Sequence, residues 1–153
     1  MEYIVKDKSG ECIFCALPQA EQDKKDKILF RGTECFVIMN IFPYNNGHIM
    51  ISPFRHLSCV TTLNEKELIE MSRLTQKSLE SLREVYKPDG FNVGFNIGKA
   101  AGAGYDEHLH NHIVPRWAGD TNFMPMLADT KVHPEHLEAT YSRLYPIFQK
   151  ISL

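Results

Sequence analysis

The stretch EHLHNHIVPRW, residues 107–117, places a histidine at every second position: His108, His110 and His112. Successive side chains of a β-strand point to opposite faces, so this spacing predicts a strand with the three imidazoles on one face, about 6.6 Å apart from one to the next. The residues between them take the other face. A single histidine is usually an ordinary polar residue, but three in register are not expected by chance, so the stretch indicates a functional site.

Two chemistries fit this histidine row. Imidazoles at alternate positions can chelate zinc, but three same-face residues span too far for one ion, so a metal needs a ligand from a neighbouring element. Alternatively, a neutral imidazole can attack phosphorus and form a covalent phosphoramidate. That reaction needs the far ring nitrogen held by a hydrogen bond and nearby donors for the phosphate oxygens, which flanking histidines can supply.

Hydrophobic periodicity predicts strands at residues 28–31, 35–39, 48–53, 91–98 and 107–115. A long helix is expected to start after the N-cap Asn64, with Glu67 completing a capping box, and to end in residues 87–90. Its apolar stripe comprises Leu68, Met71, Leu74, Leu79, Leu82 and Val85. The strands cluster early and late around this helix, which favours an α+β domain with a mostly antiparallel sheet.

A C-terminal helix is expected to start near Pro134, which suits a first helical position. Its apolar stripe comprises Leu137, Tyr141, Leu144, Phe148 and Ile151. Pro146 is expected to bend this helix or end it, because proline lacks the backbone N–H that a helix interior uses.

The chain has 153 residues and a net charge of −2, which predicts one globular domain over residues 1–153. The charge balance provides no field for binding nucleic acid or an anionic membrane. No apolar stretch approaches the roughly 18 residues of a spanning helix. The charged N-terminus does not resemble a signal peptide, so we expect a cytoplasmic protein.

The pair Cys12 and Cys15, separated by two residues, is half of a tetrahedral zinc site. A thioredoxin-like redox pair would need a following helix in a βαβ setting, for which the sequence gives only a short candidate. Free thiols without a role are the third reading of this pair.

The motif HLHNHIV, residues 108–114, resembles the signature of the histidine triad superfamily. MNIFPYNNGHIMISPFRHL, residues 39–57, and CIFC, residues 12–15, are also similar to segments of that superfamily. PRWAGDTNFMP together with TKVHPEHLEATY resembles its branch related to diadenosine tetraphosphate phosphorylases. The likeness covers roughly residues 10–150 and implies a HIT-like fold. Asn111 departs from the pattern, since the family usually has an apolar residue there.

The resemblance implies a role for each matching residue. His110 is the expected nucleophile on the α-phosphorus of a nucleotide, and His112 is expected to donate to a phosphate or bridging oxygen. His48 resembles the histidine that lies beside the nucleophile. Asn40 matches the residue that binds the ribose hydroxyls, and Asn96 an amide near the phosphates.

A glycine-rich loop, residues 99–104, precedes the triad. Gly102 and Gly104 would let backbone N–H groups approach a phosphate closely. The loop is not a Walker A motif, because no Lys-Ser/Thr pair follows it.

The resemblance also completes the metal site. His56 and His108 are expected to join Cys12 and Cys15, which closes a four-ligand shell and makes the zinc structural. Members of the superfamily are commonly homodimers, so a homodimer is expected.

The expected function is cleavage of dinucleoside polyphosphates by a nucleotidyl hydrolase or transferase, with water or phosphate as the acceptor. Three alternatives remain from the sequence. They are a nucleoside phosphoramidase, a zinc-stabilised nucleotide-binding module with little turnover, and metal-dependent hydrolysis on the histidine row.

Overall fold

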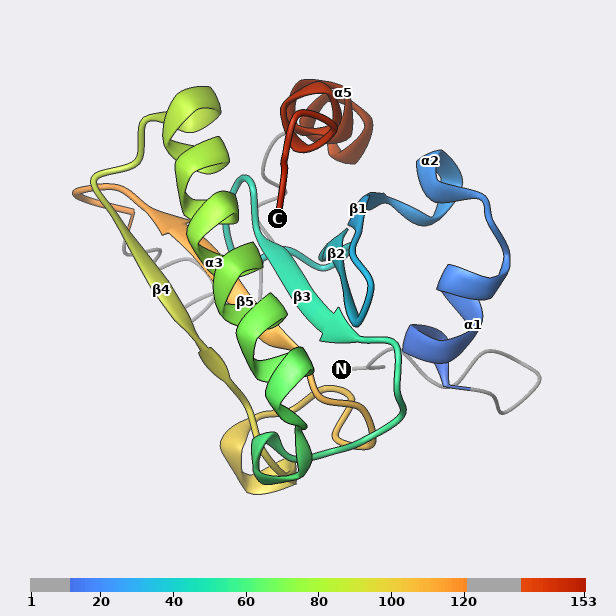
Figure 1. Ribbon diagram of the computed structural model, residues 1–153. Coiled ribbons are helices and arrows are strands. Elements are labelled where there is room, and N and C mark those ends of the chain that lie inside the picture. The colour runs from blue at the N-terminus through green and yellow to red at the C-terminus, as the bar shows by residue number, and fades with distance from the viewer. Residues whose placement is uncertain (1–11, 121–135) are drawn as a thin grey trace.

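The computed structural model describes residues 12–120 and 136–153, and it contains a five-stranded antiparallel sheet (Figure 1). The strands are β1 (Ile28–Arg31), β2 (Cys35–Met39), β3 (Ile49–Pro53), β4 (Gly90–Phe95) and β5 (Asn111–Arg116), in the order β1-β2-β3-β5-β4. The helices are α1 (Ile13–Gln19), α2 (Asp23–Asp26), α3 (Glu65–Tyr86) and α5 (Leu137–Phe148), with short 3₁₀ turns at Val60–Thr62 and Lys99–Ala101. The α+β prediction is confirmed.

The two faces of the sheet have different environments. α3 packs along one face and α5 covers its end near β1, as Figure 1 shows. The main core lies between them and the sheet, and its fully buried side chains include Leu74, Leu82, Ile113, Leu144 and Phe148. The opposite face carries the histidines, and part of it packs against α1 in a second core cluster that includes Phe14, Phe36, Ile38 and Met50.

The start of α3 follows the sequence expectation. The side chain of Asn64 accepts from the backbone N–H of Glu67 at 3.0 Å, and the Glu67 carboxylate accepts from the backbone N–H of Asn64 at 2.8 Å. One residue of the predicted apolar stripe is wrong, because Leu68 is 44% exposed. The buried stripe instead begins at Glu67, whose carboxylate is paired with Arg55 at 2.7 Å.

The predicted strand over residues 107–115 is wrong at its start, because β5 begins at Asn111. The residues just before β5 lie beside the segment that follows β3, where the Leu109 N–H donates to the Leu57 carbonyl at 2.6 Å. Alternation between the faces still holds. Leu109 and Ile113 are buried in the core with α3, and Asn111 donates to the Thr75 hydroxyl of α3 at 3.2 Å.

The other boundaries differ by smaller amounts. β4 ends at Phe95 rather than at residue 98. α5 continues two residues past Pro146, so the proline does not end the helix where it stands. Pro134 lies outside the described residues. Within residues 12–120 and 136–153, no helix has the length and apolar character needed to cross a bilayer.

Candidate functional site

The strand register places residues of β3 and β4 on either side of His112, on the face of the sheet opposite α3. Met50 of β3 lies opposite both Ile38 of β2 and His112 of β5, and Gly94 of β4 lies opposite His112 on the other side. His112 therefore stands on a part of the sheet that is paired on both sides. His110 stands just before β5, with its ring centroid 4.7 Å from that of His112.

The hydrogen bond of His110 fixes its tautomer. Its Nδ1 lies 2.8 Å from the backbone carbonyl oxygen of His108. A carbonyl only accepts, so Nδ1 carries the proton and Nε2 keeps an unprotonated lone pair. The ring of Phe14 stacks on the His110 ring at 4.8 Å. Burial lowers the pKa of His110, although the bond to the His108 carbonyl acts in the opposite direction.

A second chain of hydrogen bonds fixes the tautomer of His112. The backbone N–H of Tyr44 donates to Nδ1 of His48 at 3.0 Å, so the proton of neutral His48 is on Nε2. That Nε2 donates to Nδ1 of His112 at 2.9 Å. His112 must then carry its own proton on Nε2, where it is a donor. The pair His110 and His112 thus combines a ring lone pair with a neighbouring N–H donor.

Asn40 and His48 lie together beneath this chain. The amide of Asn40 is 3.4 Å from Nδ1 of His48, and its oxygen accepts from the backbone N–H of Phe42 at 2.9 Å. The expectation that His48 lies beside the nucleophile needs a refinement, since its hydrogen-bond partner is His112.

Burial keeps the imidazoles neutral. Burial and the neighbouring His112 and His110 lower the pKa of His48 to about 3. Burial and His110 lower the pKa of His112 to about 4. Both values lie well below the ordinary histidine value of about 6.5, so both rings are uncharged at neutral pH.

These depressed pKa values predict a loss of stability in acid. Below pH 6.5 the unfolded chain protonates these histidines while the folded chain does not, so stability falls as the pH drops from about 6.5 towards 4. For His48 alone the loss between pH 7.5 and pH 5 is about 2 kcal/mol. Urea unfolding measures the free energy of unfolding at pH 7.5 and at pH 5. The difference between the two values is expected to be smaller for His48→Gln than for the unaltered protein. His136→Gln, at an exposed histidine, is the control. An equal fall in the free energy of unfolding with pH for the two variants would contradict the assignment of this acid sensitivity to His48.

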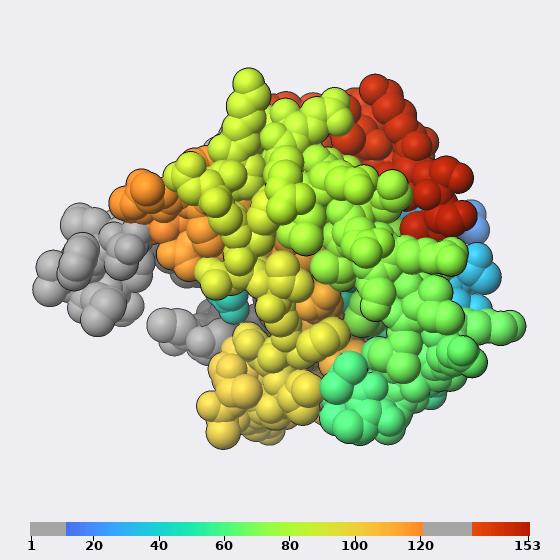
Figure 2. Space-filling view, turned by 60° about the vertical axis from the view of Figure 1, so that its left-hand side comes forward, coloured from blue at the N-terminus to red at the C-terminus, as the bar shows by residue number. Residues whose placement is uncertain are grey.

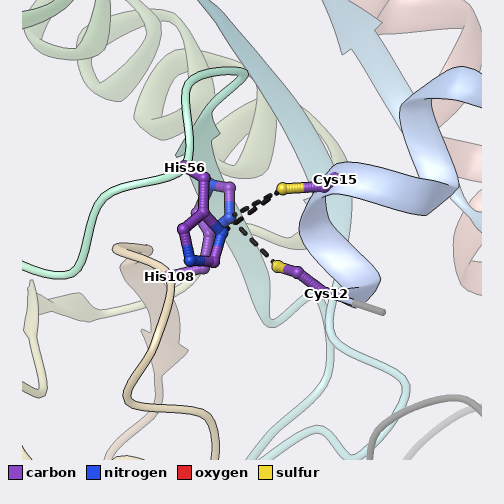
Figure 3. Close-up of side chains that lie close together, drawn as sticks. All are labelled: Cys12, Cys15, His56 and His108. Carbon is purple, nitrogen blue, oxygen red and sulfur yellow. Dashed lines mark hydrogen bonds between the residues drawn. The ribbon is translucent and has the colours of Figure 1, made fainter. Parts of the chain in front are cut away.

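A second cluster joins α1 to the histidine row (Figure 3). Ligand atoms of Cys12, Cys15, His56 and His108 all lie within 4.8 Å of one another. Cys12 Sγ lies 3.2 Å from Nδ1 of His108, and Cys15 Sγ lies 3.4 Å from Nδ1 of His56. A helical turn places two cysteines three residues apart on one side, which explains the spacing.

The donor set of this cluster fits zinc. Two thiols and two imidazoles make up a tetrahedral shell without an open position. Nε2 of His108 donates to the Pro53 carbonyl at 2.9 Å, which leaves its Nδ1 unprotonated towards the thiols. Burial and the nearby Cys12 raise the pKa of Cys15 to about 11, so binding a metal must displace a thiol proton.

The other predicted nucleotide-binding residues are placed less closely. Asn96 lines a cavity together with Tyr44 and His112. Gly102 and Gly104 are exposed, and Gly102 has a φ of 81°, a conformation that favours glycine. None of the described contacts joins these glycines to the histidines.

Two aromatic residues of the site, Phe14 and Tyr44, are not among the residues that the sequence predicts for it. Phe14 stacks on His110 and also lies 5.4 Å from the ring of His108. The ring of Tyr44 lies 4.7 Å from that of His48 and 5.9 Å from that of His112. The position of Phe14 between the two candidate cysteine ligands was an available signal.

Comparisons with known proteins agree with this geometry. Residues 21–119 match the HIT domain. The chain is 40% identical over 127 residues to an AP-4-A phosphorylase of Mycobacterium tuberculosis, covering 83% of this chain and 65% of that protein, so it spans less than two thirds of the relative. It is 26% identical over 133 residues to a bis(5'-adenosyl)-triphosphatase of Dictyostelium discoideum, covering 83% and 89% of the two chains.

The fold also has solved counterparts. A zinc-bound histidine triad family protein of Mycobacterium smegmatis superposes with a TM-score of 0.73 at 24% identity, covering 93% of this chain and 96% of that one. The domain match and the 40% identity establish the relationship by sequence, and the superposition agrees in fold. The chain belongs to the HIT domain family.

Proposed function

We propose that this protein cleaves dinucleoside polyphosphates at the α-phosphorus through a covalent nucleotidyl-His110 intermediate. The observation that carries the proposal is the hydrogen bond from His110 Nδ1 to the His108 carbonyl, which leaves Nε2 with a lone pair for attack. The mycobacterial AP-4-A phosphorylase and the Dictyostelium bis(5'-adenosyl)-triphosphatase support this substrate class.

The reaction has two balanced steps. The lone pair of His110 Nε2 forms a bond to the α-phosphorus, and the bond from that phosphorus to the bridging oxygen breaks. The leaving nucleotide takes that electron pair, while the Nε2–H of His112 donates a hydrogen bond to the phosphate or bridging oxygen. An oxygen of water or of phosphate then attacks the phosphorus and returns the P–N electron pair to Nε2 of His110; when water attacks, it gives up one proton, which passes to solvent.

Binding roles follow from the groups that remain free. The Asn40 amide keeps one N–H and one oxygen lone pair beyond its bonds to His48 and Phe42, and we assign these to the ribose hydroxyls. We assign Asn96, with the backbone of Gly102 and Gly104, to the phosphates, because these groups follow β4 and precede the histidine row.

We also propose that zinc occupies the Cys12, Cys15, His56 and His108 cluster. Bound there, the ion would hold α1 against the start of the histidine row. It would supply structural stability only, since all four of its positions are taken by protein ligands.

A homodimer in the cytoplasm completes the proposal. Within the described residues, β4 is an edge strand with Val93 45% exposed, and an exposed apolar edge is a favourable surface for a second copy. Analytical ultracentrifugation at several concentrations tests the dimer.

The products formed from diadenosine tetraphosphate test the activity. We expect AMP and ATP if water accepts the nucleotidyl group, and ADP and ATP, dependent on added phosphate, if phosphate accepts it. Chromatography of the nucleotides with and without phosphate distinguishes the two. Absence of all these products under both conditions would refute the proposed function.

A further inference from the structure

The hydroxyl of Tyr105 is buried and has no hydrogen-bond partner among the described residues. Tyr105 directly follows the glycine-rich loop, residues 99–104, and stands three residues before His108. Figure 2 shows the golden atoms of this loop on the surface, at the lower end of the molecule, so the enclosed hydroxyl contrasts with the segment that precedes it. A buried donor without a partner is costly, so the position of this hydroxyl needs a physical explanation.

The surroundings of the hydroxyl are apolar apart from the thiol of Cys12. Tyr105 and Cys12 both pack against the second core cluster, and the Tyr105 ring meets the ring of Phe14 with centroids 5.9 Å apart at 62°. Burial, and after it the side chain of Cys12, raise the pKa of Tyr105. The phenol therefore keeps its proton at neutral pH, and Cys12 is the neighbouring acceptor.

The protonation state of Cys12 decides how strong a bond from Tyr105 can be. The sulfur of a neutral thiol is only a weak acceptor. A metal displaces the thiol proton, and the resulting thiolate accepts a charge-assisted hydrogen bond, which is stronger. The orphaned hydroxyl thus gains its best partner when a metal occupies the ligand cluster. Donors that bond to a ligand from outside the coordination shell orient that ligand and raise the affinity for the metal.

We propose that Tyr105 is a positioning residue whose hydroxyl donates to the metal-bound Cys12 thiolate and so ties the end of the glycine-rich loop to the zinc site. This inference rests on the zinc proposal above and adds to it a residue outside the ligand set. The loop then has a fixed point on each side of the ion, because Cys12 lies at the start of α1 and His108 follows Tyr105 along the chain.

Two tyrosine-to-phenylalanine variants test the hydroxyl. Tyr105→Phe keeps the ring and its contact with Phe14 and removes only the donor. Tyr145→Phe removes the same group from a residue that packs against the main core, outside the ligand cluster, and is the matched control. Competition with a chromophoric chelator measures the zinc dissociation constant of each protein. We expect Tyr105→Phe to bind zinc about tenfold more weakly, and Tyr145→Phe to bind it as the unaltered protein does.

The metal-free proteins separate this role from an ordinary packing role. Without the metal the hydroxyl makes no strong hydrogen bond, so Tyr105→Phe is expected to have the Tm of the unaltered protein or a higher one. The gain in Tm on adding zinc at a fixed concentration is expected to be smaller in the variant. Hydrogen exchange over residues 99–106 is expected to be faster in zinc-bound Tyr105→Phe than in the zinc-bound unaltered protein, and equal in the two metal-free forms.

Cobalt in place of zinc reports on the thiolate directly. A hydrogen bond to sulfur lowers the energy of the sulfur lone pair that donates charge to the metal. Loss of that bond in Tyr105→Phe is therefore expected to move the sulfur-to-cobalt charge-transfer band to longer wavelength, while Tyr145→Phe keeps the band of the unaltered protein.

The outcomes separate the role of Tyr105 from the metal site itself. An unchanged charge-transfer band together with an unchanged zinc dissociation constant in Tyr105→Phe would overturn the role of Tyr105 while the zinc site stands. An equal fall in Tm with and without the metal would also overturn it, since the hydroxyl would then support the fold alone. An unaltered protein that binds neither zinc nor cobalt would refute the metal site, and this inference with it.

Discussion

Replacing His110 with alanine is expected to reduce the turnover of diadenosine tetraphosphate by about 10⁴-fold or more, because loss of a covalent nucleophile removes the reaction step itself. His110→Asn is the companion variant, since asparagine keeps a polar group that can still donate to the His108 carbonyl. Initial rates of nucleotide release measure the effect. His136→Ala, which removes an exposed histidine at the start of α5, is expected to keep the full rate.

The same mechanism predicts a trapped intermediate. Protein quenched during turnover in alkaline denaturant is expected to carry one adenylate on the peptide that contains His110, and mass spectrometry detects it. Activity that persists in His110→Ala, or in unaltered protein that never carries an adenylate, would contradict covalent catalysis. If unaltered and variant proteins both bind AMP and neither releases product, the chain is a nucleotide-binding module.

The tautomers that support this prediction could be anticipated only in part from the sequence. Alternate spacing of histidines indicated a shared face, and that face is the one opposite α3. The partner of His48 could not be read from the chain, because it depends on β3 pairing with β5 so that Met50 meets His112. A register shifted by one residue would turn His112 into the core.

Sequence signals predicted an element well where contacts between residues close in sequence dominate the stability of that element. The capping box of Asn64 and Glu67 fixed the start of α3, since both halves are contacts within four residues. Leu68 was misassigned because Arg55, from a distant loop, neutralises the buried Glu67 and lets a charged residue take the buried position. The cavity lined by His112 could not be predicted from the sequence either, because it is formed by the pairing of β4 with β5 and by the contact between Arg116 and Asp120.

Removing the metal is the second change with a large expected effect. We expect one zinc ion per chain, and we expect its chelation to lower the free energy of unfolding by at least about 3 kcal/mol. For a chain of this size that corresponds to a fall in Tm of about 6–12 °C. Calorimetry before and after chelation, with metal analysis of both samples, measures the effect.

Substitution of single ligands should reproduce the effect of chelation. Cys12→Ser is expected to lose the metal and to have a similarly reduced Tm in the presence of zinc. Cys59→Ser is the matched control, since this cysteine lies outside the ligand cluster. Full zinc content and an unchanged Tm in Cys12→Ser would contradict the assignment of this thiol as a ligand.

The regions that lose protection from hydrogen exchange when the metal is removed distinguish a structural ion from a catalytic one. The ligands come from the start of α1, from the chain after β3 and from the residue two before His110. Hydrogen exchange in metal-depleted protein should therefore quicken in α1 and near His56, while β2 and α3 stay protected by the main core. Turnover is expected to fall because Phe14, held between the two cysteines, leaves the His110 ring. A chelated protein that keeps the exchange pattern of the intact one yet loses all activity would instead place a catalytic metal on the histidine row.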